Sequence, residues 1–90
     1  MTGKRHFTSQ EAARIAGQLG IDFKTAAFDL EQFRQGLDVE LEHGRRDPAT
    51  NVTDDDPLTT GKIALAHLHE IPDYYHRLSK MEAEAEGRAQ

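Results

Sequence analysis

Two pairs of acidic and histidine residues have a spacing that could place ligands around a metal ion. Glu40 and His43 form a Glu-x-x-His pair, and His67 and Glu70 form a His-x-x-Glu pair. Residues three apart on an α-helix lie on one face, so each pair can present a carboxylate and an imidazole together, as carboxylate-bridged metal sites in helical bundles require. If the two pairs face each other, within one chain or across a dimer axis, their oxygen and nitrogen ligands suit iron, manganese or zinc.

The same residues have a second interpretation that needs no metal. His67 could be a core histidine hydrogen-bonded to Glu40 or to a tyrosine, with Glu70 beside the turn at Pro72. The residues would then form a buried hydrogen-bond network in a non-enzymatic, dimeric interaction or structural module. The sequence supports no catalytic assignment and no organic cofactor site, and whether the protein is an enzyme stays open.

Length and composition restrict the class of protein. Ninety residues form one domain with a thin core, which a second copy would help to stabilise, so we predict a homodimer; another protein partner is unknown. There is no cysteine, so a metal would have only oxygen and nitrogen ligands. Sixteen acidic against eleven basic residues give a net charge of −5, which disfavours nucleic-acid binding. No signal peptide or membrane-spanning apolar run is visible, so we expect a cytoplasmic protein without membrane contact.

Helix signals in the first half of the chain predict two helices. Thr8 and Glu11 form a capping box before a helix that ends near Gly20, a residue suited to a left-handed C-terminal cap. Asp29 caps a second helix, which carries one apolar stripe and ends at Gly44.

Two further helices follow a loop and complete an all-α bundle of four short helices. The third helix begins at Asp56 and Pro57 and is apolar nearly all round, so we expect it to be central and buried on every side. A fourth helix begins at Asp73, and its polar end from Glu82 is expected to fray. The domain spans residues 1–90, with an ordered core over about residues 7–82.

The long polar loop between the second and third helices covers residues 45–57. Its aspartate and asparagine side chains are hard oxygen donors that could hold calcium or magnesium, but such residues more often cap helices and form turns. Arg45 and Arg46 follow the second helix and could pair with the loop aspartates.

One flank of the second helix is expected to face another part of the protein. Glu40 borders the apolar stripe, and His43 lies further round beside Gly36. A glycine inside a helix costs about 1 kcal/mol relative to alanine, so Gly36 indicates close approach of another backbone. His67 and Glu70 have the firmer claim to burial, because their helix has no polar face.

Two adjacent tyrosines form the densest aromatic patch. Tyr74 shares its helix face with Leu78 and Met81 and is expected in the core. For Tyr75 three roles are open: a hydrogen bond to a loop carboxylate, a place in the lining of a site, or a half-exposed position at an interface.

Several polar motifs resemble a family of small bacterial proteins that is catalogued as a domain of unknown function. They are ELEHG at residues 40–44, DPATNVT at 47–53, DDP at 55–57, TGKIALAHL at 60–68 and PDYY at 72–75. The resemblance covers most of the chain and implies one compact domain, but no reaction. Over a few residues, the Glu40 and His43 pair is also similar to the Glu-x-x-His element of ferritin-like di-iron bundles.

Overall fold

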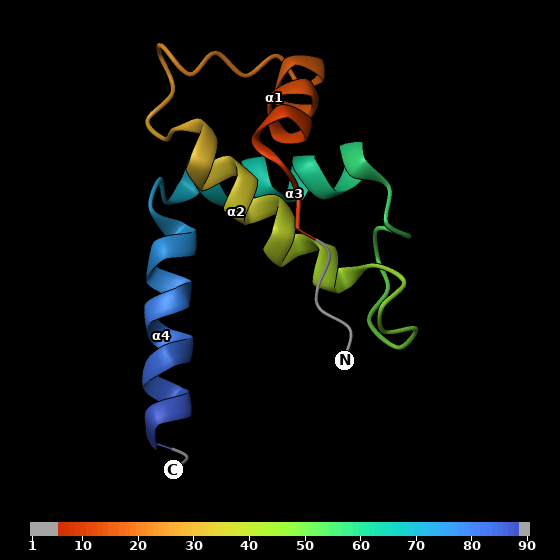
Figure 1. The fold of residues 1–90 in the computed structure, drawn as a ribbon, viewed down its shortest axis with the longest axis vertical. Helices are drawn as coiled ribbons and strands as arrows, with labels where there is room; N and C mark the ends of the chain where they lie inside the picture. The colour runs from red at the N-terminus through yellow and green to blue at the C-terminus, as the bar shows by residue number, and fades with distance from the viewer. Residues whose placement is uncertain (1–5, 89–90) are drawn as a thin grey trace.

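The computed structural model describes residues 6–88, which form helices and loops without a strand. The elements are α1 (Ser9–Gln18), α2 (Leu30–Glu40), the short 3₁₀ helix η1 (Leu41–His43), α3 (Pro57–Glu70) and α4 (Tyr74–Arg88). In Figure 1, α2 and α3 cross in the body of the molecule, α1 packs beside them, and α4 extends away. The prediction of an all-α fold with four helices is confirmed, and the long polar loop joins η1 to α3.

Side-chain caps begin α1, α2 and α3 at the predicted residues. Thr8 accepts a hydrogen bond from the backbone N–H of Glu11, and the Glu11 carboxylate accepts one from the N–H of Thr8. Asp29 and Gln32 form the same reciprocal pair at the start of α2. Asp56 caps α3. Each such cap stabilises its helix by about 1 kcal/mol and depends only on residues close in the chain.

The regular part of α2 ends earlier than predicted. It stops at Glu40, and the 3₁₀ turn η1 replaces the expected last α-helical turn before the N–H of Gly44 donates to the carbonyl of Leu41. In a 3₁₀ turn, residues three apart are eclipsed. The side chain of His43 is thereby brought onto the same side as that of Glu40.

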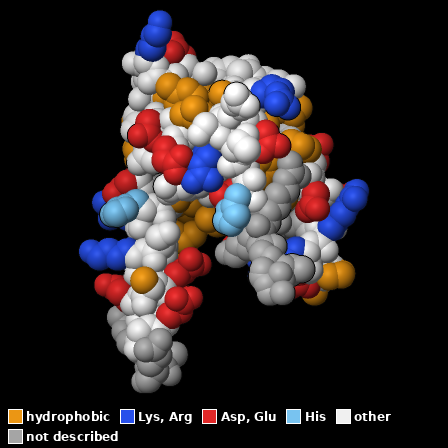
Figure 2. Space-filling view, in the orientation of Figure 1, with side chains coloured by type: hydrophobic (Ala, Val, Ile, Leu, Met, Phe, Trp, Pro, Cys, Tyr) orange, Lys and Arg blue, Asp and Glu red, His pale blue; other side chains and the backbone are white. Residues whose placement is uncertain are grey.

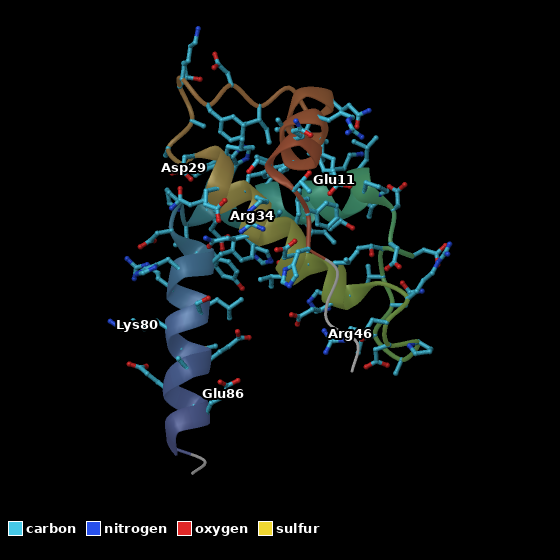
Figure 3. The ribbon with its side chains drawn as sticks, viewed as in Figure 1. Glu11, Asp29, Arg34, Arg46, Lys80 and Glu86 are labelled. Carbon is cyan, nitrogen blue, oxygen red and sulfur yellow. The ribbon has the colours of Figure 1, made fainter. Side chains whose placement is uncertain are left out.

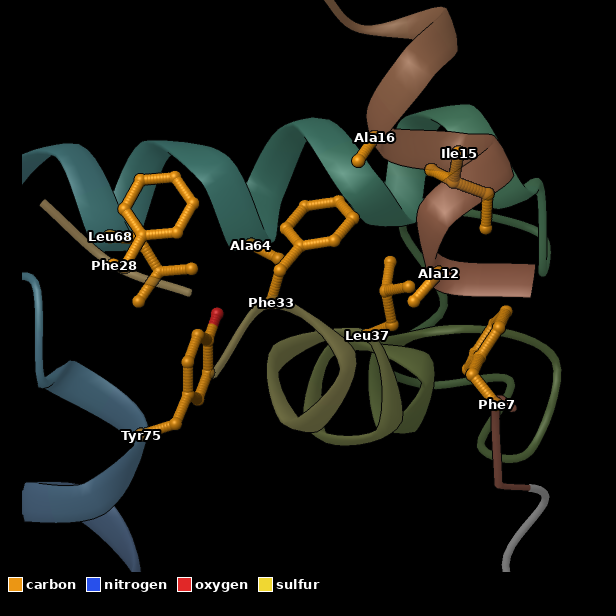
Figure 4. Packing of buried hydrophobic residues seen from close by; sticks show 10 residues of the cluster. All are labelled: Phe7, Ala12, Ile15, Ala16, Phe28, Phe33, Leu37, Ala64, Leu68 and Tyr75. Carbon is orange, nitrogen blue, oxygen red and sulfur yellow. The ribbon is translucent and has the colours of Figure 1, made fainter. Parts of the chain in front are cut away.

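The core lies between α2 and α3. Phe33, Leu37 and Leu68 are among the largest fully buried side chains. Figure 4 shows Phe33 and Leu37 in the middle of the cluster, with Tyr75 reaching in from α4 at one end and Phe7 closing the other. Tyr75 thus connects α4 to the core of the other helices.

The prediction that α3 is buried on every side is wrong. The buried residues of α3 are Thr60, Gly61, Ala64 and Leu68, whereas the exposed ones include Lys62, Ala66, His69 and Glu70. The contacts of α3 come mainly from α2 and α1, which leave one side of it facing solvent. An apolar face made partly of alanine loses little by such exposure, because alanine has little apolar area to bury.

Helix α4 leaves the body after its first turn. Tyr75 is buried and Leu78 is partly buried, but residues 79–87 are exposed on all sides. We call residues 79–87 the outer segment of α4. The helix continues through the polar end that was expected to fray from Glu82. Over the part of the chain that is described, no helix combines the length and the apolarity needed to cross a membrane.

Candidate functional site

The candidate site is built around Glu40, the last residue of α2. Its position beside the apolar stripe carries it into the interior, where it retains only 3% of its accessible surface. A carboxylate at the C-terminal end of a helix faces the negative end of the helix dipole. Because burial also removes water from it, Glu40 needs polar partners in the protein.

Three side chains from three other elements meet the Glu40 carboxylate. The hydroxyl of Tyr75 on α4 donates a hydrogen bond to Oε2 over 2.7 Å. Nε2 of His67 on α3 lies 3.6 Å from the same oxygen, and Nε2 of His43 on η1 lies 3.7 Å from Oε1. We call these four residues the Glu40 cluster. Only the tyrosine contact is short enough for a hydrogen bond, and the histidine contacts are longer electrostatic ones.

Gly36 makes room for Tyr75 to reach Glu40. A Cβ atom at this position would lie 2.6 Å from Cε2 of Tyr75 and 3.1 Å from Cβ of Ala64. Such distances are shorter than van der Waals contact, so a side chain here would push the tyrosine ring away. The prediction that another backbone approaches Gly36 is wrong, because the groups that come closest are the side chains of Tyr75 and Ala64.

Aromatic contacts hold His67 in place. Its imidazole stacks on the ring of Tyr74 with ring centroids 4.3 Å apart and planes only 3° from parallel. Tyr74 in turn meets the edge of Tyr75 at 4.9 Å. The side chain of His67 is 36% exposed and that of His43 is 54% exposed, so the cluster opens to solvent through its histidines.

The electrostatics of the cluster keep Tyr75 protonated. Burial of the phenol, followed by its hydrogen bond to the Glu40 carboxylate, raises the pKa of Tyr75 far above its ordinary value. A neutral phenol can donate a hydrogen bond to the Glu40 carboxylate, whereas a phenolate beside a carboxylate would be repelled. Tyr75 is therefore a lasting hydrogen-bond donor that ties α4 to α2.

The structure brings together three of the four predicted metal ligands, Glu40, His43 and His67. Glu70 is exposed at the end of α3 and makes no hydrogen bond or ion pair with these three. Across residues 6–88, no group of three or more histidine, aspartate or glutamate side chains is arranged to hold a metal ion. In this arrangement Oε2 of Glu40 already accepts a hydrogen bond from the hydroxyl of Tyr75.

The relative burial expected for the two pairs is reversed for the glutamates, whereas His67 is less exposed than His43, as expected. Glu40 is buried, whereas Glu70, expected to have the firmer claim, is exposed. The reason is that α3 has a solvent-facing side, while the Glu40 flank of α2 is covered by α4.

Tyr75 is the cluster member whose role the sequence left open. It is 2% exposed, and its partner is a helix glutamate rather than a loop carboxylate. The available signal was the pair of Gly36 and Glu40, four residues apart and hence on one face of α2. A glycine one turn before a carboxylate that borders the apolar stripe leaves space for a large side chain that carries a hydrogen-bond donor.

Residues 12–84 match a family model described as a protein of unknown function (DUF5661). The chain belongs to the DUF5661 family. The matched range contains all four residues of the Glu40 cluster and the whole of the loop between η1 and α3. Comparison with curated proteins found no match, and comparison with solved structures found none.

In this DUF5661 chain Asp56 caps α3, and Asp47, Asp54 and Asp55 accept hydrogen bonds from groups of the loop itself. Arg45 pairs with Asp54 over 2.8 Å, as expected, and its guanidinium holds the pKa of Asp54 below the ordinary value. The backbone N–H of Arg45 donates to Asp55, and that of Asp54 donates to Asn51. These bonds hold Asp54 and Asp55 at φ of 54° and 62°, in the left-handed region that aspartate tolerates. The loop carboxylates therefore stabilise turns and pair with Arg45, which was the alternative to a calcium or magnesium site.

Proposed function

We propose that the protein is a non-enzymatic interaction module in which α1, α2 and α3 form a body and α4 is the docking element. The observation that carries this proposal is the contrast along α4. Its first turn is fixed by the buried bond between Tyr75 and Glu40, whereas its outer segment, residues 79–87, is exposed on all sides. The buried polar groups of the Glu40 cluster are used to hold this helix.

The outer part of α4 has the pattern of a docking helix. Leu78, Met81 and Ala85 follow one another at spacings of three and four residues, which places them on one face. Met81 is 58% exposed, so this large apolar side chain is available for contact with a partner. Helical segments without tertiary contacts are marginal in water, so contact along this face would stabilise the outer segment.

A site-specific photo-crosslinker tests this role in the cells that produce the protein. Placed at Met81, it should form one discrete covalent adduct with a protein. Placed at Ala83, which lies on the opposite face about 200° away, it should not. Equal labelling at both positions, or none at Met81, would reject α4 as the docking element.

A second candidate function is transition-metal binding by Glu40, His43 and His67, with iron, manganese or zinc. It is favoured by one observation: two imidazole Nε2 atoms lie within 4 Å of different oxygens of one buried carboxylate. Side chains would have to move to turn these contacts into coordination bonds of about 2 Å.

Metal analysis of untagged protein tests this candidate. A stoichiometric metal that is lost in the variant His67→Ala would support it. Metal-free protein whose melting temperature does not change when iron, manganese or zinc is added would reject it.

A further inference from the structure

A cavity of about 290 Å³ lies between α3 and the loop that joins α1 to α2. This loop covers residues 19–29 and ends at Asp29, the cap of α2, which is labelled in Figure 3. Figure 2 shows hydrophobic side chains at the surface beneath the loop, at the end of the molecule opposite to the outer segment of α4. None of the four residues of the Glu40 cluster lines the cavity, so it is a separate feature of the protein.

Most of the side chains that line the cavity are apolar, and they come from both elements. They are Leu19, Ile21 and Phe28 from the loop and Leu65 and Leu68 from α3. Phe28 and Leu68 are buried, and the other three are half-buried. Such a wall favours the apolar part of a small molecule. The volume is at the lower limit for ligand pockets, which restricts a ligand to about ten non-hydrogen atoms.

The rim of the cavity carries three hydrogen-bond acceptors, on the exposed residues Asp22, Thr25 and His69. Oδ1 of Asp22 accepts the backbone N–H of Lys24 over 2.9 Å, whereas its Oδ2 has no partner among the described residues. The hydroxyl of Thr25 donates to the carbonyl of Asp22 and can still accept. Across residues 6–88, neither ring nitrogen of His69 has a hydrogen-bond partner, and its ring contacts only that of Phe28.

An ammonium group matches this rim. It has three N–H donors and no acceptor, and its positive charge complements the Asp22 carboxylate and the net charge of −5 of the chain. The basic residue of the loop, Lys24, does not line the cavity and so does not oppose a cation there. A carboxylate ligand would be repelled by Asp22, and an alcohol would bring one donor without a charge.

We propose that this cavity binds a small primary amine with a compact aryl or branched alkyl body. The ammonium group lies at Oδ2 of Asp22 with His69 beside it, and the apolar body packs against Phe28 and Leu68. The ligand touches the loop and α3 at once, so it holds residues 19–29 against α3. This binding site is independent of the docking role of α4.

Titration of the isotope-labelled full chain with phenethylamine, followed by its amide chemical shifts, measures the binding. A ligand of about ten non-hydrogen atoms that makes one charged contact and stays partly hydrated is expected to bind with a dissociation constant of about 0.1–1 mM. Saturable shifts should appear at lining residues such as Thr25 and Leu65, and the outer segment of α4 should show none. Phenethyl alcohol and phenylacetate, which keep the ring and lose the positive charge, should each bind about tenfold more weakly or not at all.

Asp22→Asn is the decisive variant, because asparagine keeps the oxygen that accepts the N–H of Lys24 and removes the charge. It should weaken phenethylamine binding about tenfold. Asp47→Asn is the matched control: Oδ1 of Asp47 accepts the N–H of Ala49, also two residues later, and Asp47 does not line the cavity. Its affinity for the amine should be unchanged. Ala27→Trp, which places a large side chain at an exposed lining position, should abolish the saturable shifts.

Circular dichroism should show that all three variants keep the helix content and melting temperature of the parent chain, so that a change in affinity reports on the cavity. Three results would each overturn the proposal. They are the absence of saturable shifts up to about 10 mM phenethylamine, equal affinity for the amine and for phenylacetate, and equal loss of affinity in Asp22→Asn and Asp47→Asn.

Discussion

Removal of one oxygen atom from Tyr75 tests whether the Glu40 cluster fixes α4. The variant Tyr75→Phe keeps the ring that packs against Gly36 and the core, and loses only the hydroxyl that donates to Oε2 of Glu40 over 2.7 Å. A hydrogen bond to a charged group contributes about 1.5–3 kcal/mol, and the carboxylate left behind is buried. Because His43 and His67 still lie within 4 Å, we expect a loss near the middle of that range, about 2 kcal/mol.

Urea unfolding followed by circular dichroism measures this loss, which corresponds to a decrease of about 10 °C in melting temperature for a domain of this size. Tyr74→Phe is the matched control, because the contacts of Tyr74 with His67 and Tyr75 are made by its ring, and it should cost less than about 0.5 kcal/mol. A double-mutant cycle with Glu40→Gln should give a coupling energy of about 1 kcal/mol or more. Equal losses for the two tyrosine variants, without coupling to Glu40, would refute the anchoring role.

Gly36→Ala should destabilise the protein by about 1–2 kcal/mol, because overpacking against the Tyr75 ring exceeds the gain in helix propensity. Gly17→Ala, with nothing within 4 Å of the new Cβ, should instead stabilise it by about 0.5–1 kcal/mol. The midpoints of urea unfolding should therefore shift in opposite directions in the two variants. Burial raises the pKa of Tyr75, so its contribution to stability is complete below about pH 10 and is lost as the pH rises further; the alkaline fall in melting temperature should be shallower in Tyr75→Phe. A hydrogen bond from Arg34 lowers the pKa of Glu31 to about 2, so this exposed pair contributes modestly above about pH 4 and loses its contribution as the pH falls toward 2; acid titration of Glu31→Gln should show a flatter acid limb, and an unchanged limb would contradict the pairing.

The parts of the fold that depend on nearby residues were predictable from the sequence. Thr8, Asp29 and Asp56 cap their helices because a cap needs only a side chain and a backbone N–H two or three residues later. Gly20 takes a positive φ of 74°, and the N–H of Ile21 folds back to the carbonyl of Ala16, as expected for the end of α1.

The parts that depend on which elements cover one another were not predictable. The apolar composition of α3 suggested burial on all sides, but composition does not tell how many neighbours a helix has, and Glu70 consequently lies in solvent. The position of Tyr75 depends on the angle at which α4 crosses α2, which is set by the turn after α3 and by the space at Gly36. Three of the four residues predicted for the site therefore lie in the cluster, whereas Glu70 does not, and the role of Tyr75 was left open between three possibilities.

The attachment of α4 by its first turn has a mechanical consequence. A helix of 15 residues is about 22 Å long, so a tilt of about 10° at Tyr75 displaces the far end by about 4 Å. A force applied at the C-terminal end of α4 therefore produces a large torque at its first turn, where the Tyr75 ring has almost no free space beside Gly36. Any partner that prefers one tilt of α4 therefore shifts the population of arrangements around Glu40, and a change at Glu40 redirects the tip in turn.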